Sequence, residues 1–263
     1  MDKKLASIIK YFAVFEYFPS FKEVYTFFPE KISKKRLKIL YEAKKYTVGE
    51  YSKKISKKKL QNWRFRTYIK FISLFPQIKL VGLSGSIAMM NARIDDDIDL
   101  FIITKKDHLF TARFLATIIA FIMGLKRPLG LKKASDKVCL NLFFEESNLK
   151  VPKFKQTLFV GHEVLQMKPI INKDYTYERF LQANQWVFRL FPNAPFPVIS
   201  SEATEKSLPA GRQVAKRNKL GDWLENFLKQ LQLYLIRKHQ TTEIITDTQL
   251  WFHPVDFGKK LKL

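Results

Sequence analysis

Residues 81–104, VGLSGSIAMMNARIDDDIDLFIIT, decide how the rest of the chain is interpreted. An apolar run ends at Gly85-Ser86, and after a spacer of ten residues Asp97-Ile98-Asp99 leads directly into a second apolar run. Alternate residues of a strand point to the same side, so Asp97 and Asp99 are expected to share one face while Ile98 points into the core. Two neighbouring carboxylates suit a hard divalent cation. The stretch therefore predicts a metal site where the second strand begins.

The Gly-Ser pair predicts a second binding element in the same stretch. A turn at Gly85 allows backbone N–H groups to approach a phosphate closely, and a short helix is expected to start near Ile87. A phosphate-binding turn next to metal-binding carboxylates is typical of nucleotide chemistry. The alternative interpretation is that residues 95–97 form a solvated turn and that Gly85 is an ordinary loop glycine.

Leu83-Ser84-Gly85-Ser86 and Asp97-Ile98-Asp99-Leu100 together resemble the signature of the polymerase β-like nucleotidyltransferase superfamily. In that family an apolar residue and Gly-Ser are followed, after about ten residues, by Asp-apolar-Asp-apolar. The resemblance covers residues 78–145. It implies an α+β core with a mixed sheet. It also implies an enzyme that transfers a nucleoside monophosphate from a nucleoside triphosphate to a hydroxyl and releases pyrophosphate.

The same resemblance implies roles for individual residues. Asp97 and Asp99 would bind two Mg²⁺ or Mn²⁺ ions, and Ser84, Gly85 and Ser86 would bind the nucleotide. Basic residues are expected to assist at the phosphates, although the sequence does not rank them. The candidates are Lys105, Lys126, Arg127, Lys132 and Lys133.

The chain departs from the family pattern at the third carboxylate. The matching strand, residues 138–144, has Asn141 at its middle polar position, and an amide coordinates Mg²⁺ without adding charge. Strand alternation predicts Glu145 on the same face as Asn141, about 13 Å away and too far to bind the same ion. Glu145 or Glu146 is a candidate general base for the acceptor, and the alternative is a solvated strand end.

Composition narrows the class of protein. The 263 residues include 46% hydrophobic residues, enough to bury a core. The single cysteine, Cys139, excludes an internal disulfide framework or a Cys-rich zinc site and is interpreted as an inert core residue. No signal peptide is expected, and the most apolar window, Leu109–Leu125, is short for a span of about 20 residues and is predicted to be a buried helix. The expected compartment is the cytoplasm.

The net charge of +23 favours a polyanionic partner. Three short N-terminal helices with a basic third one have the outline of a helix-turn-helix, which would place Lys34, Lys35, Arg36 and Lys38 near a DNA or RNA backbone. The alternative is a helical cap with a solvated basic face. Peripheral binding to an acidic membrane surface is a weaker hypothesis.

Periodicity divides the chain into three regions. Residues 1–75 are predicted to be helical, with one long lysine-rich helix at 53–74. The α+β core at 76–150 is predicted to have strands at 78–83, 98–104 and 137–144. Residues 151–263 are predicted to be mainly helical, with a flexible insert at 200–218.

Two functions from different classes follow from these patterns. The first is a metal-dependent nucleotidyltransferase whose acceptor hydroxyl the sequence does not identify. The second is a non-catalytic nucleotide- or nucleic-acid-binding regulatory protein, in which the core has lost catalysis together with its third carboxylate. His162, on a predicted helix, is interpreted as structural, because no second histidine has ligand spacing.

Overall fold

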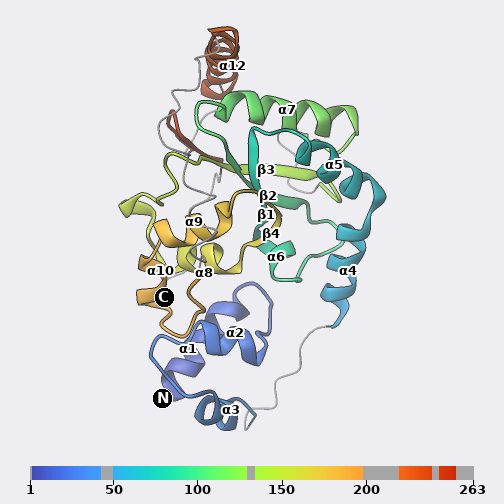
Figure 1. Cartoon of the computed structure of the whole chain (residues 1–263). Coiled ribbons are helices and arrows are strands. Elements are labelled where there is room, and N and C mark those ends of the chain that lie inside the picture. The colour runs from blue at the N-terminus through green and yellow to red at the C-terminus, as the bar shows by residue number, and fades with distance from the viewer. Residues whose placement is uncertain (1, 43–49, 129–133, 198–218, 239–242, 253–263) are drawn as a thin grey trace.

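The computed structural model describes residues 2–42, 50–128, 134–197, 219–238 and 243–252. Within these residues the fold is α+β, with helices on both faces of a mixed six-stranded sheet (Figure 1). The strand order is β4-β1-β2-β3-β6-β5. The strands are β1 (Ile78–Leu83), β2 (Ile98–Thr104), β3 (Val138–Glu145), β4 (Lys168–Asn172), β5 (Ile244–Ile245) and β6 (Gln249–Trp251).

Strands β1 and β2 have the bounds that the sequence predicts. β1 pairs antiparallel with β2, and β2 pairs parallel with β3, so that Asp99 lies opposite Cys139. β3 begins one residue later and ends one residue later than predicted. The edge strand β4 was not predicted, because Lys168 and Pro169 interrupt its short apolar run.

One face of the sheet is covered by α5 (Trp63–Ser73) and α7 (Leu109–Ile122). Apolar side chains of both helices pack on the inward residues of β1, β2 and β3, and α7 is the buried helix that the apolar window predicts. The short helix α6 (Gly85–Ala88) contributes Ile87 to the same cluster. α12 (Lys219–Arg237) lies against α7 on its outer side (Figure 1).

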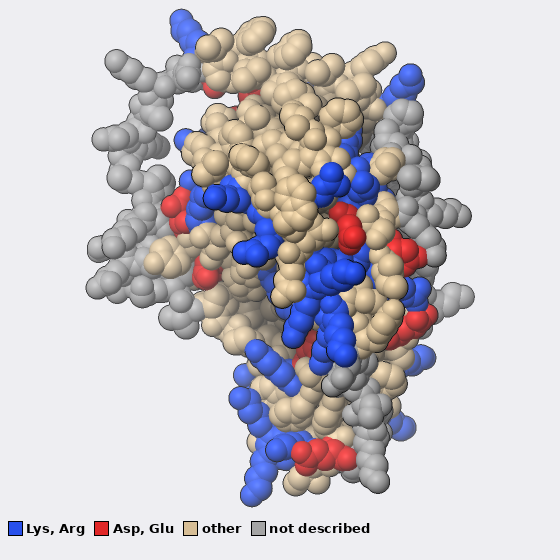
Figure 2. All heavy atoms as spheres, turned by 90° about the vertical axis from the view of Figure 1, so that its right-hand side faces the viewer, with Lys and Arg blue, Asp and Glu red and all other residues tan. Residues whose placement is uncertain are grey.

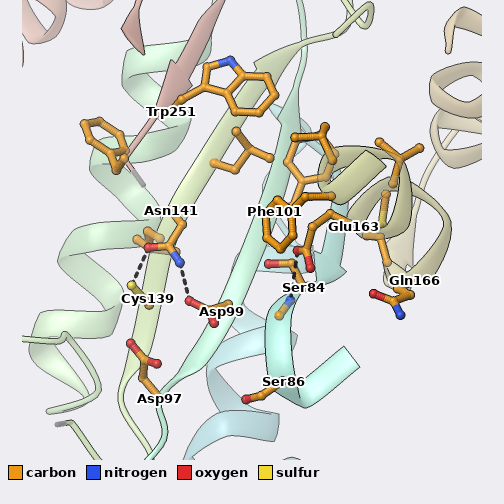
Figure 3. A pocket seen from close by; sticks show the side chains of 18 of the residues that line it. Ser84, Ser86, Asp97, Asp99, Phe101, Cys139, Asn141, Glu163, Gln166 and Trp251 are labelled. Atoms are coloured by element: carbon orange, nitrogen blue, oxygen red, sulfur yellow. Dashed lines mark hydrogen bonds between the residues drawn. The ribbon is translucent and has the colours of Figure 1, made fainter. Parts of the chain in front are cut away.

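The other face of the sheet carries α8 (Leu158–Gln166), α9 (Thr176–Ala183) and α10 (Trp186–Leu190), with a 3₁₀ turn at Lys153–Lys155 before them. Their core with Phe101 and Phe144 is rich in aromatic rings. This face is the one toward which Asp99 points, so α8 forms the opposite wall of any site on the carboxylates (Figure 3).

The N-terminal helices pack against α8 and α10 rather than on the sheet. They are α1 (Asp2–Ala13), α2 (Phe21–Thr26) and α3 (Lys34–Glu42). Ser20 and Glu23 form the capping box that starts α2, with the Ser20 backbone N–H donating to Glu23 at 2.7 Å. The buried core of this unit is largely aromatic.

The predicted single helix at residues 53–74 is wrong in one respect, since it is two helices, α4 (Glu50–Gln61) and α5. Asn62 separates them, because its side chain accepts the Arg64 N–H at 2.9 Å and caps the start of α5. Within the described residues, no helix is both long enough and apolar enough to cross a bilayer. The predicted insert at 200–218 lies outside the described residues.

Candidate functional site

The two carboxylates predicted to bind metal lie together at the start of β2. Asp97 directly precedes the strand and Asp99 is its second residue, and both line a cavity of about 1200 Å³ (Figure 3). A carboxylate oxygen of each and the Cys139 thiol lie within 4.8 Å of one another. This spacing allows one divalent cation to contact all three side chains.

Gly85 fits this site for two physical reasons. Its φ of +60° lies in the left-handed region, and a Cβ atom there would stand 2.7 Å from the Asp99 Oδ2. The neighbouring Ser84 backbone N–H donates to the Asp99 carbonyl at 3.0 Å. The turn after β1 is therefore held against the start of β2, as the sequence pattern predicts.

The loop before the carboxylates is fixed by a network of polar contacts. Ser86 donates its hydroxyl to Asp96 at 2.9 Å, and Asp96 also accepts the Arg93 backbone N–H at 2.9 Å. From α4, the buried Lys59 ammonium donates to the carbonyls of Ile94 and Asp96, both at 2.8 Å, and pairs with Asp136 at 2.9 Å. Lys59 therefore positions this loop. The sequence did not indicate this role, because Lys59 stands in a run of three lysines.

Asp97 and Asp99 have different partners. Arg127, one of the unranked basic candidates, pairs with Asp97 at 2.5 Å and also contacts the Cys139 sulfur at 3.5 Å. The Asn141 amide donates to Asp99 and accepts from the Cys139 thiol. Asn141 thus faces Asp99, as expected for the third-ligand position. Cys139 is a member of the site rather than the inert core residue predicted.

The other basic candidates differ in where they lie. Lys126 lines the cavity, whereas Lys105 does not. Lys132 and Lys133 lie outside the described residues. Among the described candidates, Arg127 is the one with a direct contact to a carboxylate of the site.

Glu145 lies on the opposite face of β3 from Asn141, and the prediction that both share a face is wrong. Asn141 is an extra residue at a β-bulge, because Leu100 pairs with Leu140 while the next residue, Phe101, pairs with Leu142. The bulge reverses the alternation beyond it. Glu145 is buried, accepts the Ser147 hydroxyl and does not line the cavity.

Its neighbour Glu146 is also held away from the site. It accepts the Lys106 backbone N–H at 3.2 Å and pairs with Arg179 at 3.3 Å. A general base from this end of β3 therefore has no support in the geometry.

Sequence reasoning missed Glu163, the acidic residue of α8 that faces the carboxylates. Its carboxylate accepts the Gly85 backbone N–H at 3.4 Å, so it occupies the donor that the sequence assigns to a phosphate (Figure 3). No pattern in residues 158–166 marks it, because α8 approaches the turn through the tertiary fold.

Burial and neighbouring charges raise the pKa of ionisable groups in this cavity. Burial, followed by the charges of Asp97 and Glu163, raises the pKa of Asp99 to about 7. Burial raises the pKa of Glu163 to about 7 as well, against the stabilising Gly85 N–H. Burial and the nearby Asp99 raise the pKa of Cys139, so its thiol stays protonated. A site with this electrostatic character is suited to a cation.

The basic residues assigned to nucleic acid lie apart from the cavity. Lys34, Lys35, Arg36 and Lys38 are exposed on α3, at the end of the molecule remote from α7 (Figure 1). Lys38 pairs with Glu42 at 3.6 Å, and Lys34 lies 5.4 Å from the centre of the Tyr25 ring. Figure 2 shows a further gathering of Lys and Arg over the face where α4 and α5 lie.

Comparison with known proteins identifies no relative of this chain. No protein-family model matches the chain, and no curated protein and no solved structure is significantly similar to it.

Proposed function

We propose that the protein is a metal-dependent nucleotidyltransferase with a polymerase β-like core, which moves a nucleoside monophosphate from a triphosphate to an acceptor hydroxyl. The observation that carries the proposal is the placement of Asp97 and Asp99 against the Gly85 turn, at the edge of a cavity of about 1200 Å³. A triphosphate with its metal needs both elements within one cavity.

The donor set fits a divalent cation. The two carboxylates supply the oxygen donors that Mg²⁺ and Mn²⁺ take, and burial followed by the charges of Asp97 and Glu163 raises the pKa of Asp99. Asp97 and Asp99 would hold Mg²⁺ or Mn²⁺. Asn141 presents its amide N–H to Asp99 and its carbonyl oxygen to Cys139, so its side-chain amide would turn over to add an uncharged oxygen donor. A bound ion supplies charge neutralisation at the phosphates and assists the departure of pyrophosphate.

The chain's own residues account for how a nucleotide would be held. The Gly85 N–H and the Ser86 hydroxyl border the cavity and would donate to phosphate oxygens, with Ser84 on the strand side. For this the Ser86 hydroxyl would turn from Asp96, to which it donates at 2.9 Å. Glu163 competes for the Gly85 N–H. With a pKa near 7, Glu163 carries a proton over part of the neutral range, which reduces its repulsion of a phosphate. Arg127 offers a positive charge beside Asp97.

The test is transfer of label from each α-³²P nucleoside triphosphate, with Mg²⁺ or Mn²⁺ and with RNA, DNA and cell extract as acceptors. We expect transfer by the wild type and a loss of about 10³-fold or more in Asp97→Asn, since a metal-binding carboxylate acts on the transition state. The matched control is Asp174→Asn, a partly exposed residue paired with Lys79 outside the cavity, at a φ of 52° that asparagine tolerates. Equal transfer by wild type and Asp97→Asn would contradict the proposed site.

A second candidate function is favoured by Asn141. Because this residue replaces the third carboxylate and its amide donates to Asp99, the site has one charge fewer for metal than the family pattern implies. A nucleotide-binding regulatory protein would bind labelled triphosphate in the same cavity without transferring it. Asp97-dependent binding with no transfer to any acceptor would favour this candidate.

A further inference from the structure

Helix α12 is anchored to the molecule by polar side chains. The buried Glu225 carboxylate accepts the backbone N–H groups of Phe110 and Thr111 at 2.7 and 2.8 Å, at the start of α7. The buried Gln232 donates to the Phe110 carbonyl at 2.8 Å and accepts from Arg113 at 2.6 Å. With Leu228 between them, these residues form the inward face of α12.

The apolar stripe of α12 points outward. Trp223 is 61% exposed and Phe227 52% exposed, with their rings stacked at a centroid distance of 5.7 Å. At 100° per residue, the exposed apolar residues of this helix fall within an arc of about 120°. We call them the α12 stripe: Leu220, Trp223, Leu224, Phe227, Leu231, Tyr234 and Leu235.

This arrangement is the reverse of an ordinary surface helix, whose apolar side packs inward. Aromatic side chains present about 150–250 Å² each, and leucines somewhat less. Multiplying these areas by the exposed fraction of each stripe residue gives roughly 700 Å² of exposed apolar surface. The largest apolar patch of a typical monomer covers about 300–600 Å². The size of the stripe indicates a surface that a partner covers.

The area and chemistry of the stripe favour a second copy of this chain as that partner. A two-fold pair presents the same stripe from both sides, so about 700 Å² on each copy gives roughly 1,400 Å², within the range of a specific interface. Within the bounds of α12, the arc of the stripe holds no charged residue, which suits its own copy better than a charged partner, and the first charge on this face is Lys238 just after the helix. The chain's segment 198–218 contains no aromatic residue and carries six charged residues, a poor match for this surface.

We propose that two copies of the protein associate through the outward face of α12, stripe against stripe about a two-fold axis. The cavity and its proposed chemistry play no part in this inference. A lipid surface is the competing occupant. Interfacial helices expose a basic polar face alongside the apolar one. In α12 the exposed polar residues beside the stripe are Lys219, Asn226, Gln230 and Arg237, of which two are basic, and the opposite flank carries Glu225 and Gln232 in contact with α7.

The test measures the mass of the full chain by sedimentation equilibrium over a wide concentration range, for the wild type and Phe227→Asp. We expect a concentration-dependent species of twice the chain mass of 31.0 kDa. We also expect Phe227→Asp to weaken association roughly 100-fold or more, because it places two charges at the centre of the interface. The matched control is Phe71→Asp on α5, a phenylalanine that is 49% exposed, with circular dichroism to verify folding.

Three results would overturn the proposal. One is a wild type that stays at the chain mass at every concentration. Another is a dimer that survives Phe227→Asp, or one that Phe71→Asp disrupts equally. The third is a wild type of chain mass that sediments with phosphatidylcholine vesicles through Phe227, which would assign the stripe to lipid.

Discussion

On one side of α8, His162 lies between the rings of Tyr11 and Phe27, at centroid distances of 3.8 and 4.1 Å. On the other side its neighbour Glu163 accepts the Gly85 N–H and faces the cavity that holds Asp99. Both residues are ionisable, and His162 is buried whereas Glu163 is partly buried in the wall of the cavity. They differ in their surroundings: His162 lies among aromatic rings, whereas Glu163 faces carboxylates.

This contrast separates a structural buried group from the ionisable groups of the proposed site. Burial lowers the pKa of His162 to about 3, and its buried Nδ1 has no hydrogen-bond partner among the described residues, so it acts as an uncharged ring in an aromatic core. Burial and like charges raise the pKa of Asp99, which costs folding energy with no packing gain. A protein keeps such charges together when a ligand uses them.

The largest effect expected from this contrast concerns His162. Its folded pKa of about 3 lies below the usual 6.5, so the unfolded state binds the proton first and stability is lost as the pH falls below 6.5. At 1.36 kcal/mol per pH unit, the wild type should lose roughly 2–3 kcal/mol of unfolding free energy through His162 between pH 7 and pH 4.5. We expect His162→Phe not to show this loss. Urea unfolding at both pH values measures it.

His108→Phe is the matched control, since His108 is partly exposed ahead of α7. It should leave the pH dependence of the wild type almost unchanged. If His162→Phe loses stability toward pH 4.5 as steeply as the wild type, the aromatic core does not hold His162 uncharged and the contrast fails on this side.

A smaller effect of opposite pH sign is expected at Asp99. Its folded pKa of about 7 exceeds the ordinary 3.8, so its contribution is fully present below pH 3.8 and lost as the pH rises through 7. Asp99→Asn should therefore unfold at a higher temperature than the wild type at pH 8 in EDTA, with a gain of about 1 kcal/mol after discounting for partial exposure. The gain should shrink at pH 5.

Asp97→Asn provides the control for this measurement. Asp97 pairs with Arg127, so its substitution removes an attractive contact and should not stabilise the fold. If Asp99→Asn instead decreases stability at pH 8, the Asp99 charge is stabilised by its neighbours in the folded chain. That result would contradict the contrast between His162 and the carboxylates of the cavity.

The sequence predicted the local part of the site and missed the part built by the fold. Asp97, Asp99 and Gly85 could be identified because strand alternation and turn chemistry act over a few residues. The outcome at Glu145 differed because a β-bulge at Asn141 shifts the alternation, and no residue type marks that bulge. Glu163 comes from a helix remote in sequence, so its approach to Gly85 depends on tertiary packing.

Helix α12 shows the same limit at the level of a whole element. Its amphipathic pattern is evident in the sequence, yet periodicity gives the direction of the stripe relative to the helix and not relative to the protein. Glu225 and Gln232 decide the orientation by binding the start of α7. The polar contacts of these two residues thereby override the apolar pattern that would normally set the inward face.

The central claim is that Asp97 and Asp99 hold a divalent cation together with a triphosphate. Titration of Mn²⁺ followed by electron paramagnetic resonance tests it directly and needs no knowledge of the acceptor. We predict that the wild type binds Mn²⁺ at least about 10-fold more tightly when a nucleoside triphosphate is present, and that Asp97→Asn combined with Asp99→Asn abolishes this binding while the chain stays folded. Equal Mn²⁺–nucleotide binding by the wild type and the double variant would contradict the claim.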